Sequence, residues 1–382
     1  MFEVTKLRFN FIDLLAAPRR ALKAKKIWTI LIGLVIAYPL FLLFTYSAFV
    51  VDGYAPADIW NRYGLYPPFN LASGVLVSLA AIITYLVGIA ILIAVVLVCA
   101  TIVSRMTYRE LKGDPFYSVS EGTSFFKRHW GAVFFAPIAV ALIIAFFLVV
   151  AVFMAAISKI PWAGELLFIA LLPVYLAGAI FTIYTAVVLL ITVLYGPSIA
   201  ACWEDDTLGT IFQAYTITWN QPWRIVIYSL LLAALTLAGL LVYGTAISGG
   251  YLFVKFVFGQ SWLMGSELAR LTAFAESLVF HGAAGLAPWV PMAGQLLNTG
   301  PAGGWEVFAG SLLALMLMIS FGTVIAYGLS IVSTGQTIAY LIFKQRIDDT
   351  NLLERIDEED QETDTATIPA PADAAGPAPA DG

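Results

Sequence analysis

Residues 71–103 read LASGVLVSLAAIITYLVGIAILIAVVLVCATIV, a run of 33 residues without a charged side chain. A hydrocarbon core about 30 Å thick is crossed by about 20 helical residues that each rise about 1.5 Å. This run is therefore long enough to form a transmembrane helix. Five further long apolar runs predict an all-α integral membrane protein with about six spans. The spans are expected near residues 27–51, 71–103, 131–157, 166–200, 225–258 and 307–343.

The composition of the whole chain agrees with a membrane protein. Of 382 residues, 60% are hydrophobic and 12% are charged, which excludes an ordinary soluble globular domain. Residues 348–382 contain eleven acidic residues and a single basic one, Arg355, so the rest of the chain is net basic. A net basic membrane protein is suited to contact anionic lipid. The sequence lacks the interleaved Arg and aromatic residues that are typical of nucleic-acid binding.

The distribution of Lys and Arg between the runs predicts the orientation. Sixteen of the 20 basic residues flank the runs on one side, and only Arg62, Lys159, Lys255 and Arg270 lie on the other. Because positive residues resist translocation, both termini are expected in the cytoplasm. A basic region of 26 residues precedes the first run, so we expect that span to be retained rather than cleaved as a signal peptide.

The segments outside the spans differ in character. Residues 259–306 form a long connection on the outer side, in which residues 266–280 have the apolar spacing of an amphipathic helix. Residues 347–382 are expected to be an acidic, Pro/Ala-rich, disordered cytoplasmic tail. Four positions are candidate breaks inside the longest spans. They are Pro173, Pro197, Gly249 and Gly250.

A short amphipathic stretch and a Trp precede the first, third and fifth spans. The three Trp residues and four basic residues that precede two of them are candidate interfacial anchors: Trp28, Trp130, Trp223, Arg19, Arg20, Lys127 and Arg128. In the third stretch an apolar stripe runs along one helical face through Leu208, Ile211, Phe212, Tyr215 and Trp219. Such helices lie in the membrane interface on the cytoplasmic side. The chain could therefore consist of three degenerate repeats, near residues 1–104, 105–201 and 202–346, or each stretch could be only a positive-inside anchor.

One segment resembles a known family. Residues 195–228 carry Pro197 near the end of a span, the acidic turn Glu204–Asp206, an amphipathic helix and then Trp223. This order is similar to the membrane domain fused to some bacterial glycerophosphodiester phosphodiesterases and to related six-span proteins, with a fainter echo at residues 114–137. The resemblance implies a bacterial inner-membrane protein. It carries over no active site, because the family's catalytic residues lie in a separate soluble barrel without a counterpart in this sequence.

The sequence offers little for chemistry inside a bilayer. No ionisable residue lies in the central part of any predicted span, although catalysis or ion coupling at depth normally requires one. The only histidines, His129 and His281, fall on opposite predicted sides, which excludes a shared metal site or a His-dependent triad. We expect no catalytic residue, metal or cofactor, and an interfacial enzyme built on His129 and residues 204–206 is the remaining alternative.

The sixth span contains a regular row of hydroxyl groups. Six side chains recur at spacings of three and four residues and share one helical face. They are Ser320, Thr323, Tyr327, Ser330, Thr334 and Thr337. This candidate polar face could line a crevice for a neutral solute or a lipid headgroup, or it could be a helix-packing seam.

These observations favour a non-catalytic membrane protein. We expect a scaffold, an accessory subunit or a lipid-organising module that contacts membrane lipids, including anionic headgroups on the cytoplasmic side. A protein partner is possible, and no nucleic acid is expected. The alternative hypothesis is a channel or facilitator for a neutral solute or lipid that uses the polar face of the sixth span.

Overall fold

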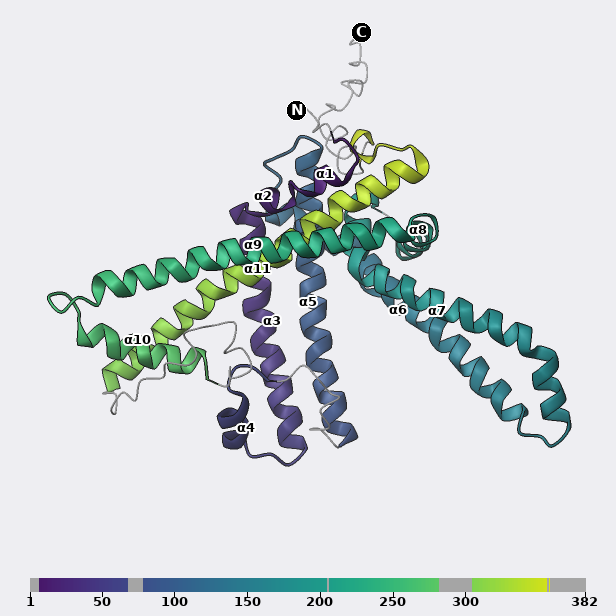
Figure 1. The fold of residues 1–382 in the computed structure, drawn as a ribbon, viewed down its shortest axis with the longest axis horizontal. Helices are drawn as coiled ribbons and strands as arrows, with labels where there is room; N and C mark the ends of the chain where they lie inside the picture. The colour runs from purple at the N-terminus through teal and green to yellow at the C-terminus, as the bar shows by residue number, and fades with distance from the viewer. Residues whose placement is uncertain (1–6, 68–77, 205, 282–303, 356, 358–382) are drawn as a thin grey trace, which may run out of the picture.

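The computed structural model describes residues 7–67, 78–204, 206–281, 304–355 and 357, and this part of the chain contains helices and no strand (Figure 1). Six of the helices are long and apolar enough to cross a membrane. They are α3 (Ala24–Val51), α5 (Leu79–Leu111), α6 (Val119–Ile157), α7 (Ala163–Trp203), α9 (Pro222–Phe258) and α11 (Gly304–Asp348). The predicted all-α class with six long apolar helices is confirmed.

The shorter elements lie at the two ends of the long helices (Figure 1). One end carries α1 (Phe11–Leu14), α2 (Ala17–Ala21), α8 (Thr207–Asn220) and the 3₁₀ turn η4 (Leu352–Glu354). The other end carries α4 (Pro56–Tyr63) and α10 (Ser266–Val279). Helix α10 matches the amphipathic helix predicted in the long connection, and it packs on α11. Residues 282–303 of that connection lie outside the described residues.

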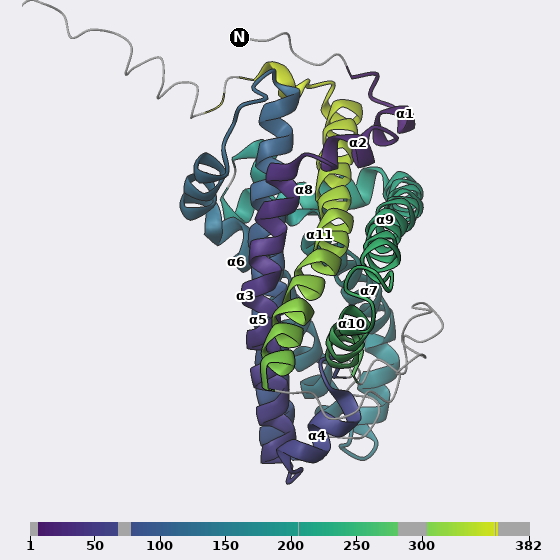
Figure 2. The ribbon, with the colours of Figure 1, turned by 90° about the vertical axis from the view of Figure 1, so that its left-hand side faces the viewer.

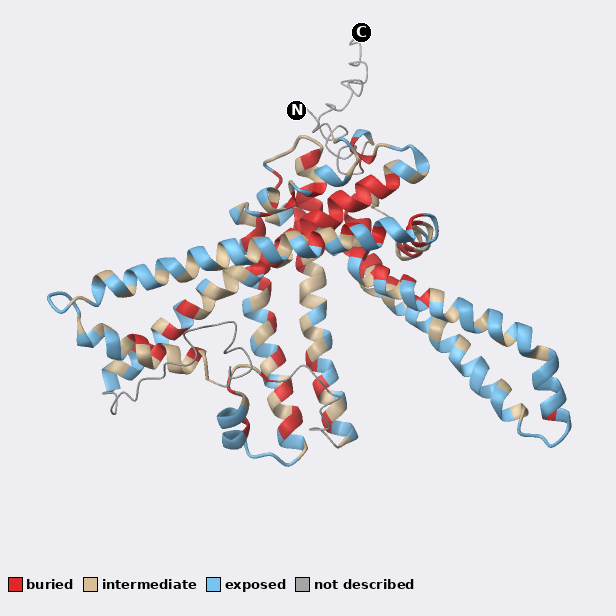
Figure 3. Ribbon diagram, in the orientation of Figure 1, coloured by how far each residue is buried: buried red, intermediate tan, exposed pale blue. Residues whose placement is uncertain are grey.

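Most of the buried residues gather in one region, which we call the head. The head is the place where α1, α2, α8 and η4 meet the adjoining ends of the long helices, and Figure 3 shows its concentration of buried positions. Its core joins α5, α7 and the C-terminal half of α11 through residues such as Val103, Ile199 and Ile338. The head is therefore a compact helical core built from segments far apart in the sequence.

Three helix pairs leave the head and diverge (Figure 1): α3 with α5, α6 with α7, and α9 with α11. Viewed from the side, the pairs extend away from the head in a common direction (Figure 2). No residue in the most apolar stretch of α7 is buried, and few are buried in the corresponding stretch of α6. Apolar surface of this extent is stable only in contact with lipid or another apolar surface.

Helix α6 joins an amphipathic stretch directly to a span. Ser118 and Glu121 form a capping box, in which the Glu121 N–H donates to Ser118 Oγ at 3.2 Å and the Ser118 N–H donates to Glu121 Oε2 at 2.5 Å. His129 leaves helical geometry at φ −112° and ψ 15°. The kink at His129 separates the first turns of α6 from the apolar part of the helix.

The four candidate breaks inside the spans were wrong. Helix α7 continues through Pro173 and Pro197, and α9 continues through Gly249 and Gly250. A break inside hydrocarbon would leave backbone N–H and C=O groups without partners, so continuation is favoured even at residues that end helices in water.

The first residues of the predicted disordered tail are instead folded onto the head. After α11 ends at Asp348, the chain turns back and buries Leu352 and Leu353 in the core of the head. The expected tail was placed at residues 347–382, but residues 352–355 and Asp357 pack against the head. Residues 356 and 358–382 lie outside the described residues.

Candidate functional site

A buried charge cluster occupies the head and begins on the last turns of α5. Arg105, Arg109 and Lys112 follow the apolar run at positions i, i+4 and i+7, so their side chains leave one face of the helix. The side chain of Arg105 is fully buried, and those of Arg109 and Lys112 are largely buried. Buried positive charges are tolerated only beside compensating anions, and two carboxylates from distant parts of the chain supply them.

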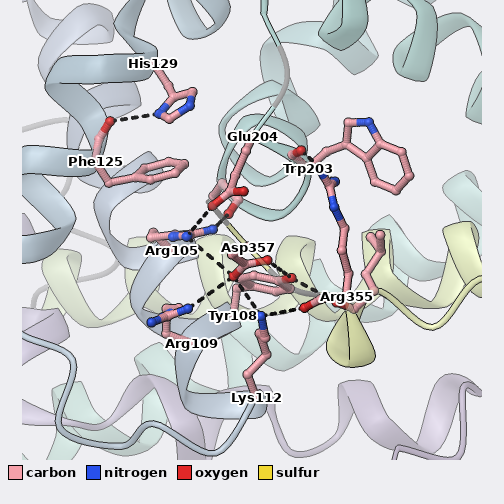
Figure 4. Close-up of polar contacts among 12 residues, drawn as sticks. Arg105, Tyr108, Arg109, Lys112, Phe125, His129, Trp203, Glu204, Arg355 and Asp357 are labelled. Carbon is pink, nitrogen blue, oxygen red and sulfur yellow. Dashed lines mark hydrogen bonds and ion pairs between the residues drawn. The ribbon is translucent and has the colours of Figure 1, made fainter. Parts of the chain in front are cut away.

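The first carboxylate belongs to Glu204, the residue that ends α7. Arg105 Nη2 lies 2.6 Å from Glu204 Oε1, and Arg105 Nη1 donates to the carbonyl oxygen of Ala201 at 2.9 Å (Figure 4). The guanidinium carbon of Arg105 lies 4.2 Å from the centroid of the Phe125 ring on α6. The planar guanidinium suits both contacts at once. Arg105 therefore connects α5, α6 and α7.

The second carboxylate belongs to Asp357, which is 1% exposed. Its Oδ2 lies 2.9 Å from Lys112 Nζ, 3.2 Å from Arg109 Nη1 and 3.5 Å from Arg105 Nη2 (Figure 4). The Tyr108 hydroxyl lies 3.0 Å from Asp357 Oδ1 and 2.9 Å from the Leu352 carbonyl oxygen. Four side chains of α5 thus converge on one acidic side chain from the C-terminal segment.

Neighbouring contacts hold that segment over the ends of α5 and α7. Arg355 Nη1 donates to the Trp203 carbonyl oxygen at 2.9 Å, and Lys112 Nζ donates to the Arg355 carbonyl oxygen at 2.7 Å. The Arg355 guanidinium carbon and Lys344 Nζ lie 4.8 Å and 4.4 Å from the centroid of the Trp203 indole ring. Residues 352–355 and Asp357 therefore form a clasp, a name we use for these residues below.

A second ionic group joins the N-terminal arm to α5. Glu110 lies 2.9 Å from Lys23 Nζ and 3.1 Å from Lys26 Nζ, and its distance to Arg20 Nη1 is 3.6 Å. Lys25 Nζ donates to the carbonyl oxygen of Tyr117 at 2.7 Å. Part of the basic cluster that precedes the first span is thus engaged inside the head.

The candidate polar face of α11 divides into two halves. In the half farther from the head, Ser320 Oγ donates to the Met316 carbonyl oxygen at 2.8 Å, and Thr323 Oγ1 donates to the Ser320 carbonyl oxygen at 2.6 Å. Both hydroxyls bond within their own helix. Thr323 Oγ1 also accepts from the Tyr243 hydroxyl of α9 at 3.4 Å.

The half of the polar face nearer the head contacts other elements. Tyr327 and Ser330 donate to backbone carbonyls of the α2 segment, at Pro18 and Ala21, over 3.1 Å and 3.0 Å. Two hydroxyl pairs at 3.4 Å connect the remainder of this face to α5 and α7. These pairs are Thr334 with Thr107 and Thr337 with Ser198. The hydroxyls near the head therefore lie in contacts between helices.

Six of the seven candidate interfacial anchors remain on the surface. The side chains of Trp28, Trp130 and Trp223 are 60%, 49% and 78% exposed. Arg19, Lys127 and Arg128 are also exposed, whereas Arg20 is half-buried beside Glu110. Three exposed indoles near the base of the head are typical of side chains at headgroup depth.

Helix α8 shows how the apolar stripe predicted by the sequence is divided. Ile211 is buried against the head together with Ala214 and Ile217. Leu208, Phe212 and Trp219 are instead 60%, 69% and 75% exposed. One apolar face of α8 therefore packs on the protein, and Leu208, Phe212 and Trp219 remain exposed beside it, with the Trp219 ring edge-on to Tyr184 at 5.7 Å between centroids.

The residues considered for an interfacial enzyme are placed in structural roles. Asp206 caps α8 by accepting from the Gly209 N–H at 2.8 Å, and the His129 ring stacks on Phe125 with centroids 4.3 Å apart. Asp205 lies outside the described residues. His281 is at the far end, where its ring stacks on Trp60. Within the described ranges, no three His, Cys, Asp or Glu side chains gather closely enough to hold a metal ion.

The charge cluster was missed by the sequence analysis. The spacing of Arg105, Arg109 and Lys112 on one helical face was visible, but these residues were counted only as positive charges that set the orientation. Their anionic partners lie 99 and 248 residues away from the α5 residues that they contact. Nothing local in the sequence indicates either pairing.

Comparison with known proteins yields no relative. No protein-family model, no curated protein and no solved structure matches the chain.

Proposed function

We propose that the chain is a non-catalytic, multi-pass protein of the bacterial inner membrane that acts as a lipid-organising scaffold, with the head and both termini on the cytoplasmic side. The aromatic face of α8 is the observation that carries this proposal. Leu208, Phe212 and Trp219 are 60%, 69% and 75% exposed. A helix with such a face lies in the headgroup region with its rings among the acyl chains.

Two further features support a role at the lipid surface. Arg19 and Lys127 lie exposed near Trp28 and Trp130 in the chain, and basic residues at this depth attract anionic headgroups. The three helix pairs diverge below the head, so most of the apolar surface of α6 and α7 is open to lipid. A protein of this shape would gather lipid between its helix pairs and hold charged headgroups around its head.

The facilitator hypothesis receives less support. A solute path along α11 would need an opening near the head. There Tyr327, Ser330, Thr334 and Thr337 are engaged with α2, α5 and α7. Small hydroxyl side chains in such positions are typical of close helix packing.

Lipid selectivity tests the proposal. The full chain would be reconstituted in phosphatidylcholine vesicles that contain phosphatidylglycerol, and the motionally restricted fraction of each nitroxide-labelled lipid would be measured by electron spin resonance. We expect the protein to restrict phosphatidylglycerol more than phosphatidylcholine. Each exposed basic residue near the surface contributes about 1 kcal/mol, or about fivefold in affinity.

Matched charge variants complete the test. Arg19→Gln and Lys127→Gln should each reduce the preference for phosphatidylglycerol. Arg270→Gln removes the same charge from an exposed position at the opposite end and should preserve the preference. Equal restriction of the two lipids by the unaltered protein, or an equal loss in all three variants, would contradict the lipid-organising role.

A further inference from the structure

The clasp places one carboxylate where three cations meet. Lys112, Arg109 and Arg105 all approach the same oxygen of Asp357, at 2.9, 3.2 and 3.5 Å, while the Tyr108 hydroxyl lies 3.0 Å from the other oxygen (Figure 4). Three of the four side chains come from the last turns of α5, and the fourth belongs to Lys112, the C-cap of that helix. The recess is therefore part of a rigid helix, and only its anion comes from the C-terminal segment.

The donors around Asp357 have the chemistry of an anion site that a phosphate group also fits. Glu204 is held by Arg105 at 2.6 Å, which orients the guanidinium toward the recess. A phosphate group offers more acceptor oxygens and more negative charge than a carboxylate, and Arg and Lys clusters bind it through charge-assisted hydrogen bonds.

The recess lies on the head side of the membrane interface. Cys99 Sγ donates to the Thr29 carbonyl oxygen at 3.6 Å, so Cys99 on α5 is level with Trp28 and the start of the α3 span. Arg105 follows Cys99 by six residues, which places it about 9 Å further toward the head. The site is thus within reach of phosphate in the headgroup layer and of phosphate in the adjoining water.

We propose that Arg105, Tyr108, Arg109 and Lys112 form a phosphate-binding site and that Asp357 occupies this site as an internal substitute in the clasped state. A phosphate-bearing ligand binds by exchanging with the Asp357 carboxylate, which releases the clasp from the ends of α5 and α7. Because the clasp is tethered, its carboxylate competes at a high effective concentration. The inference goes beyond the lipid role proposed above and does not depend on it, since a lipid phosphate and a soluble phosphate share the required chemistry.

Spin-label mobility in the clasp tests the exchange. Glu354 is exposed and both native cysteines are buried, so Glu354→Cys provides a position for a nitroxide on the full chain. The protein would be placed in phosphatidylcholine nanodiscs, in nanodiscs that also contain phosphatidic acid, and in phosphatidylcholine nanodiscs with added inorganic phosphate. We expect an immobile label in the first sample and a mobile label in at least one of the others.

The two ligand sources give different results. Release by phosphatidic acid alone identifies a lipid phosphate, whereas release by inorganic phosphate identifies a soluble ligand. A label that stays immobile in both samples would overturn the proposal. The Arg109→Gln/Lys112→Gln variant, checked for folding by size-exclusion chromatography, should lose the anion-induced change in mobility.

Two variants of the acidic segment provide the matched comparison. Asp357→Asn removes the internal competitor and should tighten binding of the effective anion by between about fivefold and about 150-fold, the range typical of coupling between sites. Asp349→Asn removes an equal charge from an exposed residue outside the cluster and should leave the affinity unchanged. Equal affinities for the two variants, measured by native mass spectrometry or by isothermal titration, would refute competition by Asp357.

Discussion

Replacement of Arg105 by Met should destabilise the head more than any surface substitution of a charge. The change keeps an unbranched side chain of similar reach but removes the partner of Glu204, whose side chain is 2% exposed. It also removes the donor to Ala201 and the ring contact with Phe125. Leaving one buried charge without its partner costs about 3–5 kcal/mol. The unfolding equilibrium should therefore shift by between about a hundredfold and a few thousandfold.

The free energy of unfolding can be measured in mixed micelles, by titration with sodium dodecyl sulfate and detection of tryptophan fluorescence. Arg270→Gln is the control, because Arg270 pairs with Glu267 at an exposed position, with Nη2 and Oε1 2.5 Å apart. Exposed pairs contribute only about 0.2–1 kcal/mol. The double variant Arg105→Met/Glu204→Gln should regain part of the loss, because it no longer buries an unpaired carboxylate.

The reasoning would be refuted if Arg105→Met and Arg270→Gln had the same small effect. The double variant gives a second test. The reasoning would also be refuted if adding Glu204→Gln to Arg105→Met lowered the free energy of unfolding by as much as Glu204→Gln does in the unaltered protein. That outcome would mean that the two side chains contribute independently, as distant sites do.

Two other predictions concern single positions. Gly64→Ala should destabilise the protein by about 1–3 kcal/mol, because Gly64 has φ 50° and a Cβ there would lie 2.2 Å from the His281 carbonyl oxygen. Gly178→Ala, with open space around its Cβ position, should have little effect in the same titration. Leu353→Ala should reduce the free energy that holds the clasp on the head by about 2–5 kcal/mol, because Leu353 is buried in the core of the head. Faster limited proteolysis after residue 348 would be the measurement, and an unchanged rate would contradict the packing role.

The spans were predictable because hydrocarbon imposes a simple rule on the sequence. A run such as residues 71–103 needs only length and the absence of charge to be recognised, and the helix caps at Ser118 and Asp206 are equally local signals. The breaks expected at Gly249 and Gly250 failed for the same reason. Glycine ends helices when water can satisfy the backbone, and α9 continues because hydrocarbon offers no such partner.

The arrangement of the head was beyond local pattern. The stripe on α8 was visible, but the sequence did not show that Ile211 would face the protein while Phe212 and Trp219 would remain exposed. Asp357 belongs to an acidic segment whose composition predicts disorder, yet it is held by cations on α5. Composition averages over a segment, whereas one buried ion pair is decided by tertiary contacts.

The central claim is that the helices cross a bilayer with the head on the cytoplasmic side. Its most direct test is to label the two ends of the described chain and the turns at the far ends of the helix pairs. Single cysteines would replace Arg8 and Thr350 near the head, and Lys159 and Ser261 in the turns at the far ends of the helix pairs, all at exposed positions. Intact cells would be treated with a membrane-impermeant maleimide. The account predicts labelling at Lys159→Cys and Ser261→Cys, and protection of Arg8→Cys and Thr350→Cys until the membrane is permeabilised. Labelling of Arg8→Cys without Thr350→Cys, or equal labelling of all four, would contradict it.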